Sequence, residues 1–234
     1  MLHEIVLKIE EENGFYVDEK CYSIVEEFIE EAKKFPRDKI LIGMHYLIHS
    51  KFNFSLDAKI ELFSECLRKR KFNCKHSSLL YLVIAEKFNL PIKSVFVPNH
   101  VFVRWEGSSV FNWETTKGEK RDNKYYIKKY NISKNAIKNS VYLKSLEGKE
   151  FISAFYNVVG IQNTKMKEFE KAKENFQKAI ELVNNFPEAL WNYALASKYL
   201  GCFDEAKEKL EFLISLDTHL TNPAKELLKK LKNN

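Results

Sequence analysis

The sequence has few of the residues that interrupt regular structure. Its 234 residues include only 7 glycines and 5 prolines. Disordered and fibrous chains are usually rich in one or both, so this composition argues against those classes. The hydrophobic fraction of 45% and the aromatic fraction of 14% instead indicate a globular chain with a sizeable core. The length permits one large domain or two modest ones.

Cysteine is scarce, and long apolar runs are missing. The four cysteines (Cys21, Cys66, Cys74 and Cys202) form no C-x-x-C motif and no spacing typical of a disulfide framework. No apolar run approaches the roughly 20 residues of a membrane span, and no secretory signal pattern begins the chain. We therefore expect a cytoplasmic protein with reduced thiols, no membrane partner and no cofactor.

Acidic residues are fewer than basic residues in the stretch just after Glu114. The formal net charge is +6, and a basic stretch with interleaved tyrosines runs from Lys117 to Tyr130. Basic residues beside aromatics can bind nucleic acid. A solvated helix whose tyrosines pack on the core explains the pattern more simply, so nucleic-acid binding is not favoured. A third interpretation makes the stretch a rim that steers acidic substrates.

The residues that can carry chemistry concentrate between Asn73 and Thr116. Cys74 directly precedes a run in which apolar residues recur at helical spacing: Leu79, Leu80, Val83, Ile84 and Phe88. The N-terminus of a helix carries partial positive charge and N–H groups without intrahelical acceptors, and both stabilise a thiolate. Taken alone, such a cysteine more often fills the core, so Cys74 indicates an activated thiol only in combination with partners later in the chain.

His100 and a polar residue further on can complete a thiol site. An alternating, strand-like run begins at His100, and a second one, Val110 to Glu114, follows a Gly-Ser turn. If the two strands pair, His100 comes near Asn112 or Glu114, which share one face of the second strand. The imidazole would move the thiol proton, and the third group would orient the ring. We favour Glu114, because a carboxylate stabilises imidazolium better than the Asn112 amide does.

These segments resemble the transglutaminase-like superfamily, whose papain-like core carries Cys, His and an acid in this order. Three sequence motifs carry the resemblance: C-x-x-x-S-L-L-Y-L-x-I-A-E-x-x-x-L-P from Cys74, V-P-N-H-V-F-V-R-W around His100, and N-W-E-T-T-x-G around Glu114. It is most similar to a bacterial and archaeal branch that joins this core to tetratricopeptide repeats. The resemblance implies Cys74 as nucleophile, His100 as base and Glu114 as orienting acid, where the wider superfamily usually has Asp.

Metal binding is not favoured. His45 and His49 are four residues apart and share a helix face, but the zinc-protease pattern requires a glutamate where Tyr46 stands. A core or interface pair is the simpler interpretation. Cys66, Cys74 and His76 find no fourth ligand at a spacing typical of zinc.

The last third of the chain repeats with a period of 34 residues. The matching pairs are Tyr156 and Leu190, Gly160 and Ala194, Phe169 and Phe203, Ala172 and Ala206, Phe176 and Leu210, and Ala179 and Leu213. This period is typical of tetratricopeptide repeats, here 153–186 and 187–220, with a capping helix after them. Such modules recognise peptides in a concave groove or serve as structural or dimerisation surfaces.

The sequence thus predicts an α+β fold. Residues 1–150 would form a papain- or transglutaminase-like core, helical to about residue 70 and catalytic in type over 71–150, with residues 139–144 as one strand of its small antiparallel sheet. Residues 153–234 would form the all-α tetratricopeptide module. The expected function is acyl transfer or amide and peptide hydrolysis through a Cys-His-Glu triad, acting on a protein or peptide. The alternative is a non-catalytic scaffold that binds through its repeats and keeps a vestigial site.

Overall fold

The computed structural model describes residues 1–232, and the chain divides into two compact units. The first unit contains residues 1–95, 100–123 and 145–148, and the second contains residues 96–99, 124–144 and the chain from residue 149 onward. Segments from both sides of residue 150 therefore contribute to the second unit. The domain boundaries drawn from the sequence, 1–150 and 153–234, stay predictions.

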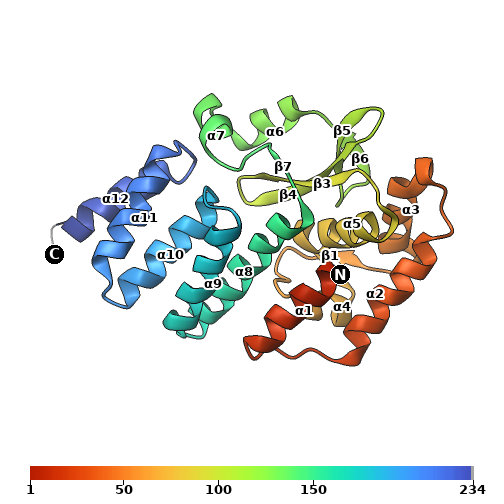
Figure 1. The fold of residues 1–234 in the computed structure, drawn as a ribbon, viewed down its shortest axis with the longest axis horizontal. Coiled ribbons are helices and arrows are strands. Elements are labelled where there is room, and N and C mark those ends of the chain that lie inside the picture. The colour runs from red at the N-terminus through yellow and green to blue at the C-terminus, as the bar shows by residue number, and fades with distance from the viewer. Residues whose placement is uncertain (233–234) are drawn as a thin grey trace. The chain divides into compact units, whose positions relative to one another are not determined.

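Short helices make up the first part of the first unit (Figure 1). They are α1 (Leu2–Glu12), α2 (Glu19–Ala32), a 3-10 turn (Arg37–Lys39), α3 (Ile40–Tyr46), a π turn (Leu47–Lys51) and α4 (Phe63–Lys69). The N-cap of α2 is Asp18, whose carboxylate accepts a hydrogen bond from the Cys21 N–H at 3.1 Å. A two-stranded parallel ladder, β1 (Ser55–Leu56) with β2 (Lys71–Phe72), leads the chain to Cys74.

The long helix α5 (Cys74–Phe88) is the centre of the first unit. Its residues from His76 to Ala85 are all buried, because α1 and α2 pack on it and β4 of the sheet does so as well. A helix that is apolar on all sides belongs in the interior of a domain. Tyr81 anchors it at mid-length: its hydroxyl donates to the Leu41 carbonyl at 3.1 Å and accepts from the Trp113 indole at 3.0 Å.

Five strands form the sheet, in the order β6-β5-β4-β3-β7 within the described residues. The strands are β3 (Ile92–Val97), β4 (His100–Glu106), β5 (Val110–Glu114), β6 (Glu119–Arg121) and β7 (Ser145–Leu146). The strands β4 and β5 pair antiparallel with Arg104 opposite Asn112, which confirms the predicted hairpin through Gly107. The mixed arrangement of helices and sheet is consistent with a transglutaminase-like core.

The strand predicted over residues 139–144 is wrong. Ser133 caps a short helix, α7 (Lys134–Asn139), by accepting a hydrogen bond from the Ala136 N–H at 2.9 Å. Past that helix only Tyr142 makes an isolated bridge, to Phe96, and the strand β7 begins at Ser145. The serine cap and the helix after it outweighed the apolar residues that suggested a strand.

The second unit is mainly helical. It contains α6 (Asn123–Tyr130), α7, α8 (Gly148–Lys165), α9 (Phe169–Leu182), α10 (Pro187–Tyr199), α11 (Phe203–Ser215) and α12 (Thr221–Lys232). Consecutive helices pack on one another from α9 to α12. Gly160 of α8 lies against Phe176 of α9, where an added Cβ would come within 2.5 Å of the ring, so this close approach requires glycine.

The period of 34 residues recurs in the backbone of the second unit. Lys167 and Gly201, 34 residues apart, both have positive φ, 63° and 75°. The hydrogen bond from the Glu168 N–H to the Asn163 carbonyl recurs from Cys202 to Ser197, each at 2.9 Å. The sequence repeat therefore reflects two turns of the same geometry, one between α8 and α9 and the other between α10 and α11.

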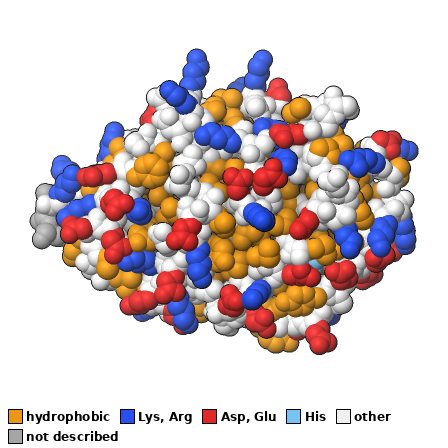
Figure 2. Space-filling model, viewed as in Figure 1, with side chains coloured by type: hydrophobic (Ala, Val, Ile, Leu, Met, Phe, Trp, Pro, Cys, Tyr) orange, Lys and Arg blue, Asp and Glu red, His pale blue; other side chains and the backbone are white. Residues whose placement is uncertain are grey.

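Basic side chains project from the surface in the region of α6 and α7 (Figure 2). The segment 123–146 contains six lysines and no acidic residue: Lys124, Lys128, Lys129, Lys134, Lys138 and Lys144. Tyr126 of this segment is fully buried. The ammonium nitrogen of Lys129 lies 5.0 Å from the centroid of the Tyr130 ring.

No helix among residues 1–232 is both long and apolar enough to cross a membrane.

We expect Glu10 to stabilise the first unit measurably. It is buried, and its carboxylate accepts hydrogen bonds from the N–H groups of Phe63 and Ser64 at 2.5 and 3.0 Å. These N–H groups begin α4, which has no side-chain cap of its own. Glu10→Leu should lower the free energy of unfolding by about 2 kcal/mol in urea titrations, the order expected for buried hydrogen bonds to a carboxylate. The exposed neighbour provides the control, Glu11→Leu, and equal stability of the two variants would contradict the assignment.

Candidate active site

Cys74 is the first residue of α5, as the apolar spacing predicts, and its side chain is partly exposed. The extended residue before it, Asn73, caps the helix: its side-chain oxygen accepts from the Lys75 N–H at 3.0 Å, and its amide nitrogen donates to the Ile60 carbonyl at 2.5 Å. This cap holds the first turn of α5 in place. The thiol consequently sits at the positive end of a helix whose start is fixed on both sides.

His76 completes this cap and has no role as a base. Its Nδ1 accepts a hydrogen bond from the Asn73 N–H at 3.3 Å, and its Nε2 donates to the Glu61 carbonyl at 2.9 Å. These two contacts define the neutral tautomer. Burial lowers the pKa of His76 to about 3, so the ring stays neutral.

His100 begins β4 and lies between the thiol and a carboxylate. Its Nε2 is 2.7 Å from Oε2 of Glu114, and its side chain is also hydrogen-bonded to Cys74. Because Nε2 faces Glu114, Nδ1 is the ring nitrogen left for the thiol. The sheet register explains the pairing: Arg104 lies opposite Asn112, so Phe102 lies opposite Glu114 and His100 is its diagonal neighbour on the same face.

The electrostatics of these three residues favour a thiolate beside an imidazolium. Burial alone would raise the pKa of the Cys74 thiol, but the hydrogen bond and positive charge of His100 outweigh it and lower the pKa. Burial likewise opposes a charge on His100, yet its bonds to Cys74 and Glu114 raise the pKa of the ring to about 9. Burial raises and His100 lowers the pKa of Glu114, with a net lowering.

Asn112 does not reach the imidazole. Its side-chain oxygen accepts from Nε of Arg104 at 2.8 Å, and its amide donates to Asn123 at 2.9 Å. Arg104 also bonds Ser145 at 2.9 Å, so it links β4 to β5 and to the first residue of β7, two strands away. Between the two candidates for the third position, the structure brings Glu114 to His100 and places Asn112 in a separate polar network.

Two threonines beside Glu114 position the site and were not anticipated from the sequence. Thr116 donates its hydroxyl to Oε1 of Glu114 at 2.8 Å, so both carboxylate oxygens are engaged. Thr115 is fully buried, and its hydroxyl bonds those of Ser77 and Ser78 at 2.8 and 3.2 Å. This contact joins the end of β5 to the first turns of α5. Because side chains alternate between the two faces of a strand, the sequence could have indicated that Thr115 faces away from Glu114. It could not have indicated which helix Thr115 contacts.

The histidine pair predicted to be structural lies beside this region. The rings of His45 and His49 are 4.2 Å apart, and burial lowers the pKa of both. A Cβ on Gly118 would come within 2.5 Å of the His45 ring, so the turn after Glu114 packs directly on it. Within residues 1–232, no three His, Cys, Asp or Glu side chains are grouped so that they could hold a metal ion.

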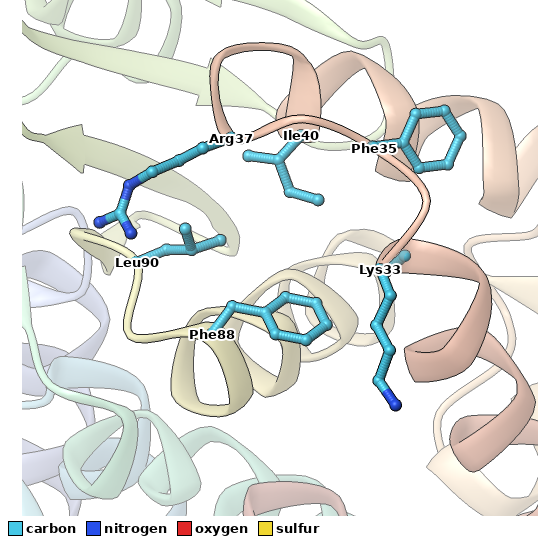
Figure 3. Close-up of a pocket in the computed structure, with 7 residues that line it drawn as sticks. Lys33, Phe35, Arg37, Ile40, Phe88 and Leu90 are labelled. Atoms are coloured by element: carbon cyan, nitrogen blue, oxygen red, sulfur yellow. The ribbon is translucent and has the colours of Figure 1, made fainter.

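A separate cavity of about 210 Å³ lies at the other end of α5 (Figure 3). Phe88 and Leu90 line one side, and Ile40 and Phe35 line the other, with the cations of Lys33 and Arg37 at its rim. Since α5 has 15 residues, its length of roughly 20 Å separates this cavity from Cys74. Neither a thiol nor a carboxylate contributes to its lining, so it has no evident part in the chemistry of Cys74.

Comparison with known proteins agrees with a transglutaminase-like core. A protein-family model described as the transglutaminase-like superfamily matches residues 23–157, which is more than half of the chain and includes Cys74, His100 and Glu114. An uncharacterized protein of Methanocaldococcus jannaschii is 37% identical over 68 residues, which are 29% of this chain and 79% of that protein. The chain belongs to the transglutaminase-like superfamily.

Proposed function

We propose that this protein is a thiol enzyme that transfers acyl groups or hydrolyses amides, with Cys74 as nucleophile, His100 as base and acid, and Glu114 as orienting carboxylate. The observation that carries the proposal is the position of the His100 ring, hydrogen-bonded to Cys74 on one side and 2.7 Å from Glu114 on the other. A base fixed between a nucleophile and an acid is the arrangement that activates thiols in unrelated hydrolases.

The chemistry follows from these positions. The Cys74 thiolate attacks an amide carbonyl carbon and forms a tetrahedral intermediate whose oxyanion faces the backbone N–H of Cys74. As the carbon–nitrogen bond breaks, His100 gives its Nδ1 proton to the leaving amine, and a thioester on Cys74 remains. Water or a second amine then attacks the thioester while His100 takes up its proton, which releases the acid or the new amide and restores the thiolate beside the imidazolium.

Two side chains that could assist substrate binding are already engaged. Lys75 forms an ion pair with Glu61 at 3.2 Å, and Arg104 bonds Asn112 and Ser145. Lys75 nevertheless contributes positive potential that lowers the pKa of Cys74. We assign both residues to the support of the site and neither to the reaction itself.

A second candidate function, peptide recognition, is supported by the helices from α9 to α11. An open cavity of about 480 Å³ lies among them. Its lining residues are Glu170, Lys173, Glu174, Gln177, Tyr193, Leu200 and Cys202. The charge of Lys173 is offset by Glu205 at 2.6 Å, so the carboxylates of Glu170 and Glu174 dominate the cavity. We propose that these helices are tetratricopeptide repeats whose cavity receives a basic side chain of a peptide, as substrate or as partner.

The activated thiol can be measured by alkylation with iodoacetamide between pH 5 and 9. Cys74 should react at a rate that stays high well below the pKa of an ordinary thiol, because His100 keeps it as thiolate. His100→Ala should lower its rate at pH 6 by about tenfold or more, since each unit of pKa is a factor of ten in thiolate. Peptide mass spectrometry would follow Cys74 with Cys202, the other partly exposed cysteine, as reference.

The same assay separates the two candidates for the third residue. Glu114→Gln keeps the shape but removes the charge that stabilises imidazolium, so it should shift the Cys74 profile toward higher pH. Asn112→Ala should leave the profile unchanged, because Asn112 bonds Arg104 and not His100. A profile that responds to Asn112→Ala and ignores Glu114→Gln would reverse the assignment.

Acyl transfer is tested with p-nitrophenyl acetate as acyl donor. The protein should release a burst of about one equivalent of nitrophenol as the thioester forms, and an added alkylamine or water should turn it over. Cys74→Ala should abolish the burst while the protein remains folded in a thermal unfolding scan. A wild-type protein that releases no burst above that of Cys74→Ala would remove the enzymatic proposal.

Peptide recognition is tested with displayed random peptides captured on full-length protein carrying Cys74→Ala. Enriched peptides should contain Lys or Arg, and Glu174→Lys should weaken their binding by about tenfold, equivalent to 1.4 kcal/mol. The control is Glu226→Lys, which makes the same change at an exposed position of α12. Equal binding by both charge-reversal variants would exclude this cavity as the recognition site.

A further inference from the structure

The turn that leads into His100 has an unusual backbone. The strand β3 ends at Val97, Pro98 and Asn99 make the turn, and His100 is the next residue. Asn99 has φ 56°, in the left-handed region that most residues other than glycine avoid and that asparagine tolerates. The direction in which β4 starts, and therefore the position of the His100 ring, depends on how firmly this turn is held.

A carboxylate from α10 holds the turn. Oε1 of Glu188 accepts a hydrogen bond from the Asn99 backbone N–H at 3.1 Å and a second from the Tyr142 hydroxyl at 2.9 Å. The Tyr142 oxygen is also 3.2 Å from Nδ1 of His219. Asn99, Tyr142, Glu188 and His219 all belong to the second unit. One side-chain oxygen thus ties the residue before His100 to the C-terminal helices.

The same turn is anchored again at the end of β3. The Leu143 N–H donates to the Phe96 carbonyl at 2.9 Å, and the Phe96 ring lies 5.2 Å from that of Phe186, the N-cap residue of α10. Phe96 and Asn99 are three residues apart, and both are bound next to the start of α10. A short segment fixed at its two ends leaves little freedom to the turn between them.

Glu188 suits this task by position and surroundings. It is the second residue of α10, after Pro187, where a carboxylate is favoured by the helix dipole. Its other oxygen, Oε2, is buried without a hydrogen-bond partner among the described residues. Burial raises the pKa of Glu188. Oε1 can accept a hydrogen bond whether the carboxyl group is protonated or ionised. The contact with Asn99 therefore depends on a side chain long enough to place an acceptor there, and less on its charge.

We propose that Glu188 is a positioning residue for His100, acting through the Asn99 backbone, so that the C-terminal helices help to align the reactive thiol–imidazole pair. This proposal rests on the proposed function, because it assigns a role to the Cys74–His100 pair. The C-terminal helices then contribute to the chemistry of the site as well as to recognition.

Three substitutions in the full-length chain separate reach from charge. Glu188→Gln keeps an oxygen at the same distance, Glu188→Asp keeps the charge but shortens the side chain by one methylene, and Glu188→Ala removes both. The measurement is the rate of Cys74 alkylation by iodoacetamide from pH 5 to 9, read by peptide mass spectrometry beside a thermal unfolding scan. We expect the Asp and Ala variants to lose about tenfold in rate at pH 6, equivalent to one unit in the pKa of the thiol, and the Gln variant to stay within about twofold of wild type.

The outcomes are decisive in each direction. Asp and Ala variants that fold and keep the wild-type profile would overturn the proposal, and so would a Gln variant as impaired as the Asp variant. If Glu188→Ala does not fold, the comparison of Asp with Gln decides alone. If Cys74 of the wild-type protein is alkylated with the pH dependence of an ordinary thiol, and His100→Ala does not change that dependence, the result counts against the proposed function. If Cys74 of the wild-type protein is activated but the Glu188 substitutions do not change its alkylation rate, only this inference is refuted.

Discussion

The imidazole of His100, shared between a sulfur and a carboxylate, is the contact on which the arrangement of the candidate site depends. Taken alone, each partner is destabilised by its burial, since charges are costly away from water. Together, the raised pKa of the ring and the lowered pKa values of the thiol and the carboxyl favour opposite charges on neighbouring groups, and the low local dielectric strengthens their attraction. Removing the charge of any one of these groups would therefore destabilise the charged forms of the other two, and this cost would exceed that of a charge removed from the protein surface.

That arrangement needs three backbone segments to be held in register, and the fold supplies the means. The helix α5 is fixed by burial on all sides and by the hydroxyl of Tyr81, which joins it to both Leu41 and Trp113. Its first turn is tied to the end of β5 through Thr115. The polar network of Arg104 and Asn112 occupies the next position along the sheet, where it connects strands without touching the imidazole. The structural pair Arg104 and Asn112 and the candidate reactive pair His100 and Glu114 thus lie next to each other on one face of the sheet.

Much of this site could be predicted because its signals are local. Apolar spacing located the start of α5 at Cys74, and a Gly-Ser turn located the hairpin that brings His100 toward Glu114. The choice between Asn112 and Glu114 could be argued only from charge, since both side chains share a strand face and the diagonal register decides which one meets the ring. Contacts between distant residues gave no signal at all: Asn99 and Glu188 are 89 residues apart. The strand expected over 139–144 failed because a local serine cap favoured a helix.

The two histidines nearest the thiol differ in a way that affects the whole site. His76, two residues from Cys74, is held neutral by burial with its pKa near 3, whereas the pKa of His100 is raised to about 9. At pH values between these two, the His76 ring is neutral and holds the helix start, while the His100 ring is protonated. A moderate change of pH within the ordinary cellular range therefore leaves both charge states in place, so that support of the helix start and the positive charge beside Cys74 are assigned to separate imidazoles.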